Sequence, residues 1–333
     1  MWRITYPSRP LVTPPRIAGE PLEALFELLK SPEDRTRYRA RLELRAHDQE
    51  KVVSAADRWI EGLDPIDQDH EHHLLEVLWV HQHHNALNLP LLRRVLRSPD
   101  YRARAAATRV LSYWRNDIKG VMDLFRTQAN DEHPRVRLET VRALSFLESA
   151  SAAEVALEIL RHPLDYYLSY TLNETIATLK PYWEPLVTSG RVLIESNTAG
   201  SEYLLARLDV AALQQAAPTP PTLLALLARA DVQPEFREKA LARLAELNST
   251  GRTAELLKAI RRADKADEAD IESVLQDLGD LLETRPVEKL QATGREIKGL
   301  AESARNSVTR RIAWVALMVA EPSISNSWQR ANK

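Results

Sequence analysis

The chain has 333 residues, of which 28% are charged, 9 are glycine and none is cysteine. Without cysteine it forms no disulfide, thiolate metal site, iron–sulfur cluster, covalent c-type haem or cysteine nucleophile of its own. Scarce glycine beside abundant leucine, alanine, arginine and glutamate predicts an all-α protein, and the formal net charge of -2 gives no overall attraction to nucleic acid or acidic membranes.

The first residues carry a strand pattern that the rest of the chain lacks. Apolar and polar side chains alternate in "WRITY", and "PSRPLVTPPRIAGEP" has the composition of an extended linker. We therefore expect residues 1–18 to be a short extended strand and linker, for which this chain supplies no partner strand. The start has no apolar signal-peptide core, and no apolar run reaches the roughly 20 residues of a membrane span, so we expect no membrane insertion.

A repeated pattern follows along the chain. "SPDYRARAAATRVLSYW" from Ser98 and "DEHPRVRLETVRALSFL" from Asp131 superpose with a shift of 33 residues, and a shift of 100 brings the second onto "DVQPEFREKALARLAEL". Looser copies lie at 31–48 and 304–320. Each copy opens with Asp, Pro or Ser, which suit a helix cap or first turn, and continues with apolar residues at helical spacing.

Most copies are preceded by another amphipathic helix, so the unit is a helix pair. One pair cannot bury its apolar face alone, and stacking of pairs predicts an α-solenoid. A second helix that opens with Asp or Pro and a "VR"-like pair resembles HEAT repeats, whereas the Trp, Gly and Tyr positions of TPR repeats are missing. We expect the following domains: N-terminal HEAT-like repeats over 19–180, an irregular hinge with one helix over 181–222, C-terminal repeats over 223–322, and a flexible tail over 323–333.

Six stretches together point to one group of proteins: "MWRITYPSRPLVTPP", "DRTRYRARLELR", "EHHLLEVLWVHQHHN", "DYRARAAATRVLSYW", "DEHPRVRLETVRALSF" and "HPLDYYLSYTL". They resemble the HEAT-repeat region of very large multidomain proteins of planctomycete-type bacteria, over nearly all of residues 1–322. In that family a glucose/sorbosone-dehydrogenase-like β-propeller precedes the repeats, and a c-type cytochrome domain with a CxxCH motif follows them.

The resemblance implies that this chain is the repeat region without its redox domains. "WRITY" would be the last strand of the propeller, and the missing CxxCH means that no activity is carried over. The implied partners are the propeller dehydrogenase and c-type cytochrome domains of the parent protein, and the implied location is the periplasm or cell envelope.

Histidine is concentrated in one stretch, "DHEHHLLEVLWVHQHH". Pairs of these histidines that are 11 residues apart lie about 16 Å apart along a helix, too far to share a metal whose bond to nitrogen is about 2 Å. The pairs with useful spacing are His70 with His73 and His81 with His84, and Glu76 is the nearest further ligand. Since a structural zinc needs four ligands, these five residues are only weak metal candidates.

A structural role accounts for the histidines better. His81 continues the apolar stripe of Leu74, Val77 and Leu78, so we expect a core histidine with a satisfied ring nitrogen. A diiron site like that of deoxyhypusine hydroxylases needs several His-Glu dipeptides, and only His70-Glu71 occurs. We expect neither a bound metal nor another cofactor.

Arginines recur at the repeat period, pairing Arg102 with Arg135 and Arg104 with Arg137. One interpretation is that they pair with acidic residues of neighbouring turns and join the repeats. The other is an interaction surface that binds phosphates, since the segment 93–142 is basic. The near-zero net charge and the lack of a lysine cluster favour the first.

The sequence contains no Ser-His-Asp elbow, P-loop or dinucleotide-binding glycine motif. We expect aromatic residues such as Trp114, Tyr166, Tyr167 and Trp183 to fill the layers between helices rather than form a binding platform. The resulting prediction is a non-catalytic scaffold, with no catalytic residues, that binds or positions other protein domains. The alternatives are a nucleic-acid-binding solenoid using 93–142 and, third, a metal-dependent enzyme.

Overall fold

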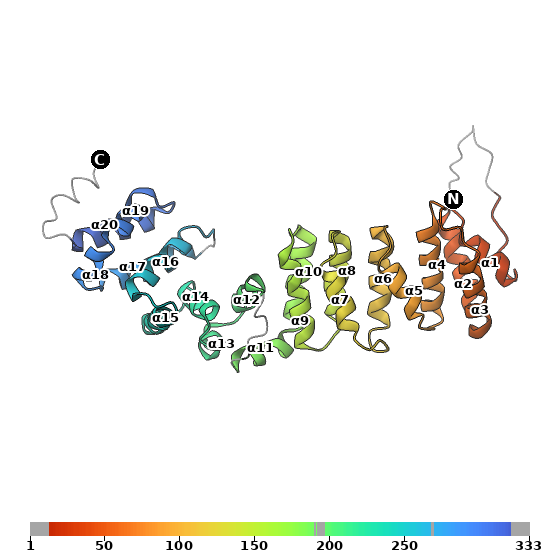
Figure 1. Cartoon of the computed structure of the whole chain (residues 1–333), viewed down its shortest axis with the longest axis horizontal. Coiled ribbons are helices and arrows are strands. Elements are labelled where there is room, and N and C mark those ends of the chain that lie inside the picture. Colours follow the sequence, from red (N-terminus) through yellow and green to blue (C-terminus); the bar gives the residue numbers. More distant parts are fainter. Residues whose placement is uncertain (1–12, 190, 192–196, 268–269, 321–333) are drawn as a thin grey trace, which may run out of the picture. The chain divides into compact units, whose positions relative to one another are not determined.

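The computed structural model describes residues 13–189, 191, 197–267 and 270–320. Within them all regular structure is helical, in 20 α-helices and one 3-10 helix, which confirms the prediction of an all-α solenoid (Figure 1). The chain divides into two compact units, Met1–Leu179 and Lys180–Lys333. The expected strand "WRITY" and the tail 323–333 lie outside the described residues. No helix of the described part has the length and apolar content that crossing a membrane requires.

Unit 1 is a row of stacked helix pairs. In chain order the helices are α1 (Leu22–Leu28), α2 (Asp34–Ala46), α3 (Gln49–Glu61), α4 (His70–His83), α5 (Leu89–Val95), α6 (Tyr101–Tyr113), α7 (Val121–Ala129), α8 (Pro134–Leu144), α9 (Ala150–Leu157), η1 (Glu158–Arg161) and α10 (Tyr166–Thr178). The helices α2, α4, α6, α8 and α10 pack each on the next as one layer, which we call the even-helix layer. The odd-numbered helices cover its other side.

The starts of three even helices, α6, α8 and α10, follow from their capping residues. The Asp100 carboxylate accepts a hydrogen bond from the Arg102 backbone N–H at the start of α6, and Asp165 does the same for the N–H of Leu168 in α10. At the start of α8 the His133 ring is the acceptor and Pro134 occupies the first position, where its missing N–H costs nothing. Buried apolar residues then recur at helical spacing and turn one face of each helix toward the odd helices.

An arginine early in the second helix of a pair closes the turn before that helix. In four pairs the Nη1 of this arginine donates hydrogen bonds to the two backbone carbonyls five and six residues earlier. These residues are Arg37, Arg104, Arg137 and Arg310. The carbonyls lie in the turn, where a helix end leaves them without partners, so the guanidinium satisfies them. We call these residues the turn-clamp arginines.

Unit 2 is also built of packed helices. They are α11 (Lys180–Thr188), α12 (Thr198–Leu205), α13 (Val210–Gln215), α14 (Pro220–Leu227), α15 (Pro234–Leu247), α16 (Arg252–Ala263), α17 (Ile271–Glu283), α18 (Val287–Ala292), α19 (Gly294–Ser303) and α20 (Ser307–Ala320). Consecutive helices pack from α14 to α17, and α20 packs on α17, α18 and α19.

The segment 181–222 differs from the expectation of an irregular hinge with one helix. Two helices, α12 and α13, lie wholly within it, α11 occupies its start and α14 begins before its end. Asn197 and Asp209 cap α12 and α13 through their side chains. Two prolines near the end of the segment, Pro220 and Pro221, stand in the first turn of α14, which proline tolerates. The domain boundaries expected from the sequence remain predictions.

Candidate functional site

The second histidine pair of α4 lies at the end of the helix. His81 is buried, and its ring nitrogens lie 3.3 Å from the Ala86 carbonyl oxygen and 3.3 Å from the Asn88 side-chain nitrogen. Burial lowers the pKa of His81, outweighing the hydrogen bond with Ala86, which favours the charged ring. His84 Nε2 lies 3.1 Å from the Leu44 carbonyl oxygen. The neighbours of both side chains are thus backbone and amide groups.

The first histidine pair and Glu76 have a different environment. Glu76 is fully buried and forms ion pairs with Arg41 and, at 3.0 Å, with Arg37, while His72 Nε2 lies 3.2 Å from its carboxylate. Burial alone would raise the pKa of Glu76, but the neighbouring His72 ring and the charge of Arg41 outweigh it and lower that pKa. Two arginines therefore already balance the charge of this candidate ligand.

His73 is buried near Asp67, with 3.9 Å between its Nδ1 and the carboxylate, and His70 is partly exposed at the helix start. Within the described ranges, no three His, Asp or Glu side chains converge in a way that could hold a metal ion. Of the candidate metal ligands, Glu76 therefore contacts Arg37, Arg41 and His72. His81 and His84 contact other groups.

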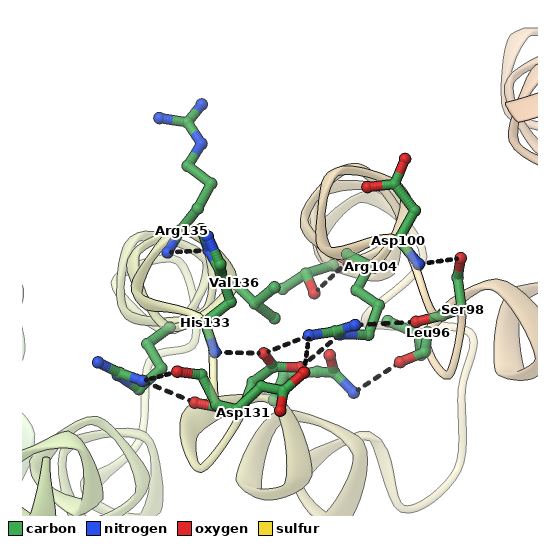
Figure 2. Close-up of polar contacts among 12 residues, drawn as sticks. Leu96, Ser98, Asp100, Arg104, Asp131, His133, Arg135 and Val136 are labelled. Carbon is green, nitrogen blue, oxygen red and sulfur yellow. Dashed lines mark hydrogen bonds and ion pairs between the residues drawn. The ribbon is translucent and has the colours of Figure 1, made fainter. Parts of the chain in front are cut away.

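Two of the four arginines singled out by the repeat, Arg104 and Arg137, are turn-clamp residues and are buried. Arg104 also donates two hydrogen bonds of 2.8 and 2.9 Å to the Asp131 carboxylate in the next repeat. Figure 2 shows its guanidinium between the Ser98 carbonyl and Asp131. Burial lowers the pKa of Arg137, against the nearby charge of Asp131. Both side chains belong to the joints between helices rather than to a surface.

The other two arginines are exposed. Arg102 forms an ion pair of 3.1 Å with Asp100, and Arg135 one of 2.9 Å with Glu139. In Figure 2 the Arg135 side chain points away from the buried network around Asp131. On an α-helix, residues two apart face in nearly opposite directions, which separates exposed Arg102 from buried Arg104.

Arg135 belongs to a group of four side chains on α6 and α8, which we call the arginine cluster: Arg109, Arg135, Arg142 and Glu139. The Glu139 carboxylate lies 2.6 Å from Arg109, 2.9 Å from Arg135 and 3.9 Å from Arg142. Its side chain is only 5% exposed, whereas the three arginines are about half exposed. The hydrogen bond to Glu139 raises the pKa of Arg109. Three positive charges and one negative leave a net charge of +2.

A hollow of about 380 Å³ lies at this cluster. Besides the four charged residues, it is lined by Tyr113, Leu138 and Thr171. Arg109 and Arg142 were not among the residues that the sequence singled out as a surface. The same 33-residue spacing that pairs Arg102 with Arg135 also pairs them, so the signal was present.

Exposed aromatic residues are concentrated in the same layer. Among the described residues of unit 1, all the exposed large aromatic side chains lie on even helices or just after α8: Tyr38, Tyr101, Tyr113, Phe146, Tyr166, Tyr167 and Tyr170. Trp114 and Trp183 are buried as expected, but the expectation that Tyr166 and Tyr167 fill layers is wrong. The buried face of α10 is formed by Leu168, Leu172, Thr175 and Ile176, and the two tyrosines lie off it.

Comparison with known proteins identifies the repeat type in part of unit 1. Residues 87–177 match the family model of HEAT repeats, which confirms this prediction for α5 to α10. No curated protein matches the chain significantly.

Two solved structures similar to the chain are themselves designed or engineered. A computationally designed armadillo repeat protein for modular peptide recognition is 12% identical, with coverage of 90% of this chain and 100% of that chain and a TM-score of 0.19. An engineered protein is 14% identical, with coverage of 92% of this chain and 97% of that chain and a TM-score of 0.19. Similarity at this TM-score carries no argument about function.

Proposed function

We propose that this chain is a non-catalytic protein-interaction scaffold, and that the exposed face of the even-helix layer of unit 1 binds other protein domains. The observation that carries the proposal is the concentration of exposed tyrosine side chains on that face, beside the half-exposed arginines of α6 and α8. Tyrosine and arginine are enriched at protein interfaces and dominate their binding energy, because they combine a large contact area with hydrogen bonding.

We further propose that the partners are redox domains of a larger protein. Support comes from the sequence resemblance, in which HEAT repeats stand between a propeller dehydrogenase and a c-type cytochrome. Stacked repeats present an extended surface, which suits a role in holding two domains in fixed positions. The proposal includes the cell-envelope location that the resemblance implies.

A nucleic-acid-binding solenoid is the second candidate, favoured by the exposed arginines of α6 and α8. Binding to a phosphate backbone depends on positive charges that release counterions. Here Asp100 pairs with Arg102, and Glu139 pairs with the other three exposed arginines, so carboxylates offset part of the charge. This offset ranks nucleic acid below protein as the partner.

Photo-crosslinking from single positions tests the proposed function. We would replace Tyr113 in α6 by p-benzoylphenylalanine, a photoreactive aromatic residue that fits the exposed site. The same replacement of Thr127, on the exposed side of α7, is the control. We expect adducts with a propeller or c-type cytochrome polypeptide from Tyr113 and none from Thr127. Equal protein adducts from both positions would contradict the proposal, and adducts with nucleic acid alone would favour the second candidate.

A further inference from the structure

The arginine cluster has more donors than its own carboxylate uses. Arg109 binds both oxygens of Glu139, through Nε at 3.2 Å and Nη2 at 2.6 Å, and Arg135 Nη2 lies 2.9 Å from one of them. A guanidinium carries five N–H donors, so Arg135 keeps donors that point elsewhere. Arg142 Nη1 is 3.9 Å from Glu139, beyond hydrogen-bonding distance. The cluster is therefore charged, partly exposed and not saturated by its own acid.

We propose that the arginine cluster binds a carboxylate side chain within an acidic peptide segment of a partner protein. The inference rests on the proposed protein-interaction function and names the partner's chemistry. Arginine guanidiniums bind carboxylates through paired hydrogen bonds, which are stronger than those between neutral groups. Because Glu139 is buried beneath the arginines, it holds Arg109 and Arg135 in place before any partner arrives.

The hollow is suited to a peptide side chain with an apolar neighbour. Its volume of about 380 Å³ falls at the small end of the range for ligand pockets. Tyr113, with 64% of its surface exposed, and Leu138 line it beside the guanidiniums. The charged groups supply the site for a carboxylate, and the ring supplies contact area for the residue next to it.

The arrangement of charge favours a peptide over nucleic acid. Counted from the helix caps, the positions of Arg135 and Arg142 in α8 correspond to Tyr167 and Glu174 in α10. The row of arginines thus gives way to a tyrosine and an acid on the next helix. A nucleic-acid backbone would need basic groups along its whole path, whereas a short acidic segment needs only the cluster.

Paired variants separate the cluster from charge in general. Arg135→Gln and Arg142→Gln each remove one half-exposed positive charge from the cluster. Arg126→Gln, on α7, removes a charge of similar exposure, 47% against 51% for Arg135, from the opposite layer. From the usual contribution of a partly exposed ion pair, we expect each cluster variant to lose about two- to five-fold in affinity. The double variant should lose about ten-fold. Arg126→Gln should leave the affinity unchanged.

The probe is a displayed library of random peptides of about twelve residues, selected against the full chain. Selected peptides are then measured by fluorescence anisotropy with the wild type and the variants, alongside oligothymidylate of matched length. We expect the selected peptides to be rich in Asp and Glu, to bind less well to both cluster variants, and to bind less well as salt rises from about 50 to about 200 mM. Unfolding midpoints of the variants check that the fold is intact.

Three outcomes would overturn the inference. The first is that selection yields no peptide or yields peptides without acidic enrichment. The second is acidic peptides that bind Arg135→Gln, Arg142→Gln and wild type equally, in which case the protein-interaction function stands and only the assigned site fails. The third is that oligothymidylate binds more tightly than the selected peptides and that its binding depends on the cluster. This result would replace both the acidic-peptide site and the protein-interaction function with nucleic-acid binding.

Discussion

Position along a helix decides what each arginine of α6 does. Arg104 lies on the buried side, where it clamps the turn carbonyls of Ser98 and Pro99 and reaches Asp131 of the next repeat. Arg102, two residues earlier, is largely exposed and forms its ion pair with Asp100 of its own turn. One side chain joins two repeats, while the other is available to solvent and partners.

Replacing Arg104 by alanine should therefore destabilise unit 1 strongly. The change removes the charged partner of the Asp131 carboxylate, which keeps the His133 N–H as a donor, and takes the Arg104 donor from two turn carbonyls. Removing one partner of a buried ion pair costs about 3–5 kcal/mol, whereas Arg102→Ala should leave the free energy of unfolding nearly unchanged, because that side chain is largely exposed. Urea unfolding followed by circular dichroism measures both, and equal midpoints for the two variants would refute the assignment of Arg104 as a joint.

The repeat period in the sequence predicted these arginines, and the charge balance favoured a role in joining repeats, but the sequence did not say which of them have that role. A shift of 33 residues shows that Arg102 is equivalent to Arg135 and Arg104 to Arg137, and the period alone does not say which side of the helix is covered. Burial depends on the odd helices and the turns, which come from distant parts of the sequence. Glu139 illustrates the same limit, because its three arginine contacts combine its own helix with α6.

His81 should make stability depend on pH. Burial lowers its pKa in the folded chain, so the unfolded chain binds a proton that the folded chain does not. Its contribution is thus fully present above the unfolded pKa of about 6.5 and is lost as the pH falls from there toward the folded value. We expect the urea midpoint to drop between about pH 7.5 and 5.5, and to drop less in His81→Gln.

The same measurement separates packing from protonation. The difference between wild type and His81→Gln at high pH reports the lost packing and the hydrogen bonds to Ala86 and Asn88. A difference that stays constant on acidification would show that His81 has the same pKa in the folded and the unfolded chain. Burial also lowers the pKa of His73 and His83, so part of the pH dependence should persist in the variant.

At the scale of elements, α17 and α20 meet at a glycine. A Cβ atom on Gly279 would lie 2.7 Å from two side-chain atoms of Ile312, closer than real Cβ contacts come. Ile312 is buried and branched at Cβ, so its side chain has little freedom to move aside within a helix. The glycine therefore allows the two helices their close approach.

Gly279→Ala should destabilise unit 2 although alanine is the better helix former. Overpacking costs about 1–3 kcal/mol, which exceeds the roughly 1 kcal/mol gained from helix propensity. Gly299→Ala, on α19, is the matched control, because nothing lies within 4 Å of its added Cβ. It should raise the free energy of unfolding by about 0.5–1 kcal/mol. Thermal melts of both variants test this, and stabilisation by Gly279→Ala would contradict the packing.

The helices themselves were predictable to different degrees. In α6 and α8, an acid or proline at the start and apolar residues at helical spacing marked the element and its first turn. In 181–222 a proline at the start of α14 looks like a break in the sequence, whereas in the structure it occupies a favourable first turn of the helix. Local signals indicate that a boundary exists, and only packing decides on which side of it the helix lies.

For the whole molecule, the two units have cores of their own, and within unit 1 each even helix packs on its immediate neighbours. In such arrays the contacts are short-range along the stack, so stability is approximately a sum of repeats and the interfaces between them. A lost joint between two repeats should consequently weaken its neighbourhood first, and leave distant repeats nearly unchanged.

Hydrogen exchange of the full-length Arg104→Ala variant tests this locality. The lost joint connects α6 to the turn before α8, so amides in these helices should exchange faster than in wild type by at least about ten-fold, the factor for each 1.4 kcal/mol of lost local stability. Amides of α15 to α17 in unit 2 should exchange at the wild-type rate. Peptide-resolved mass spectrometry reads both regions in one sample, and acceleration spread evenly over both units would show that the chain opens as a single cooperative body instead.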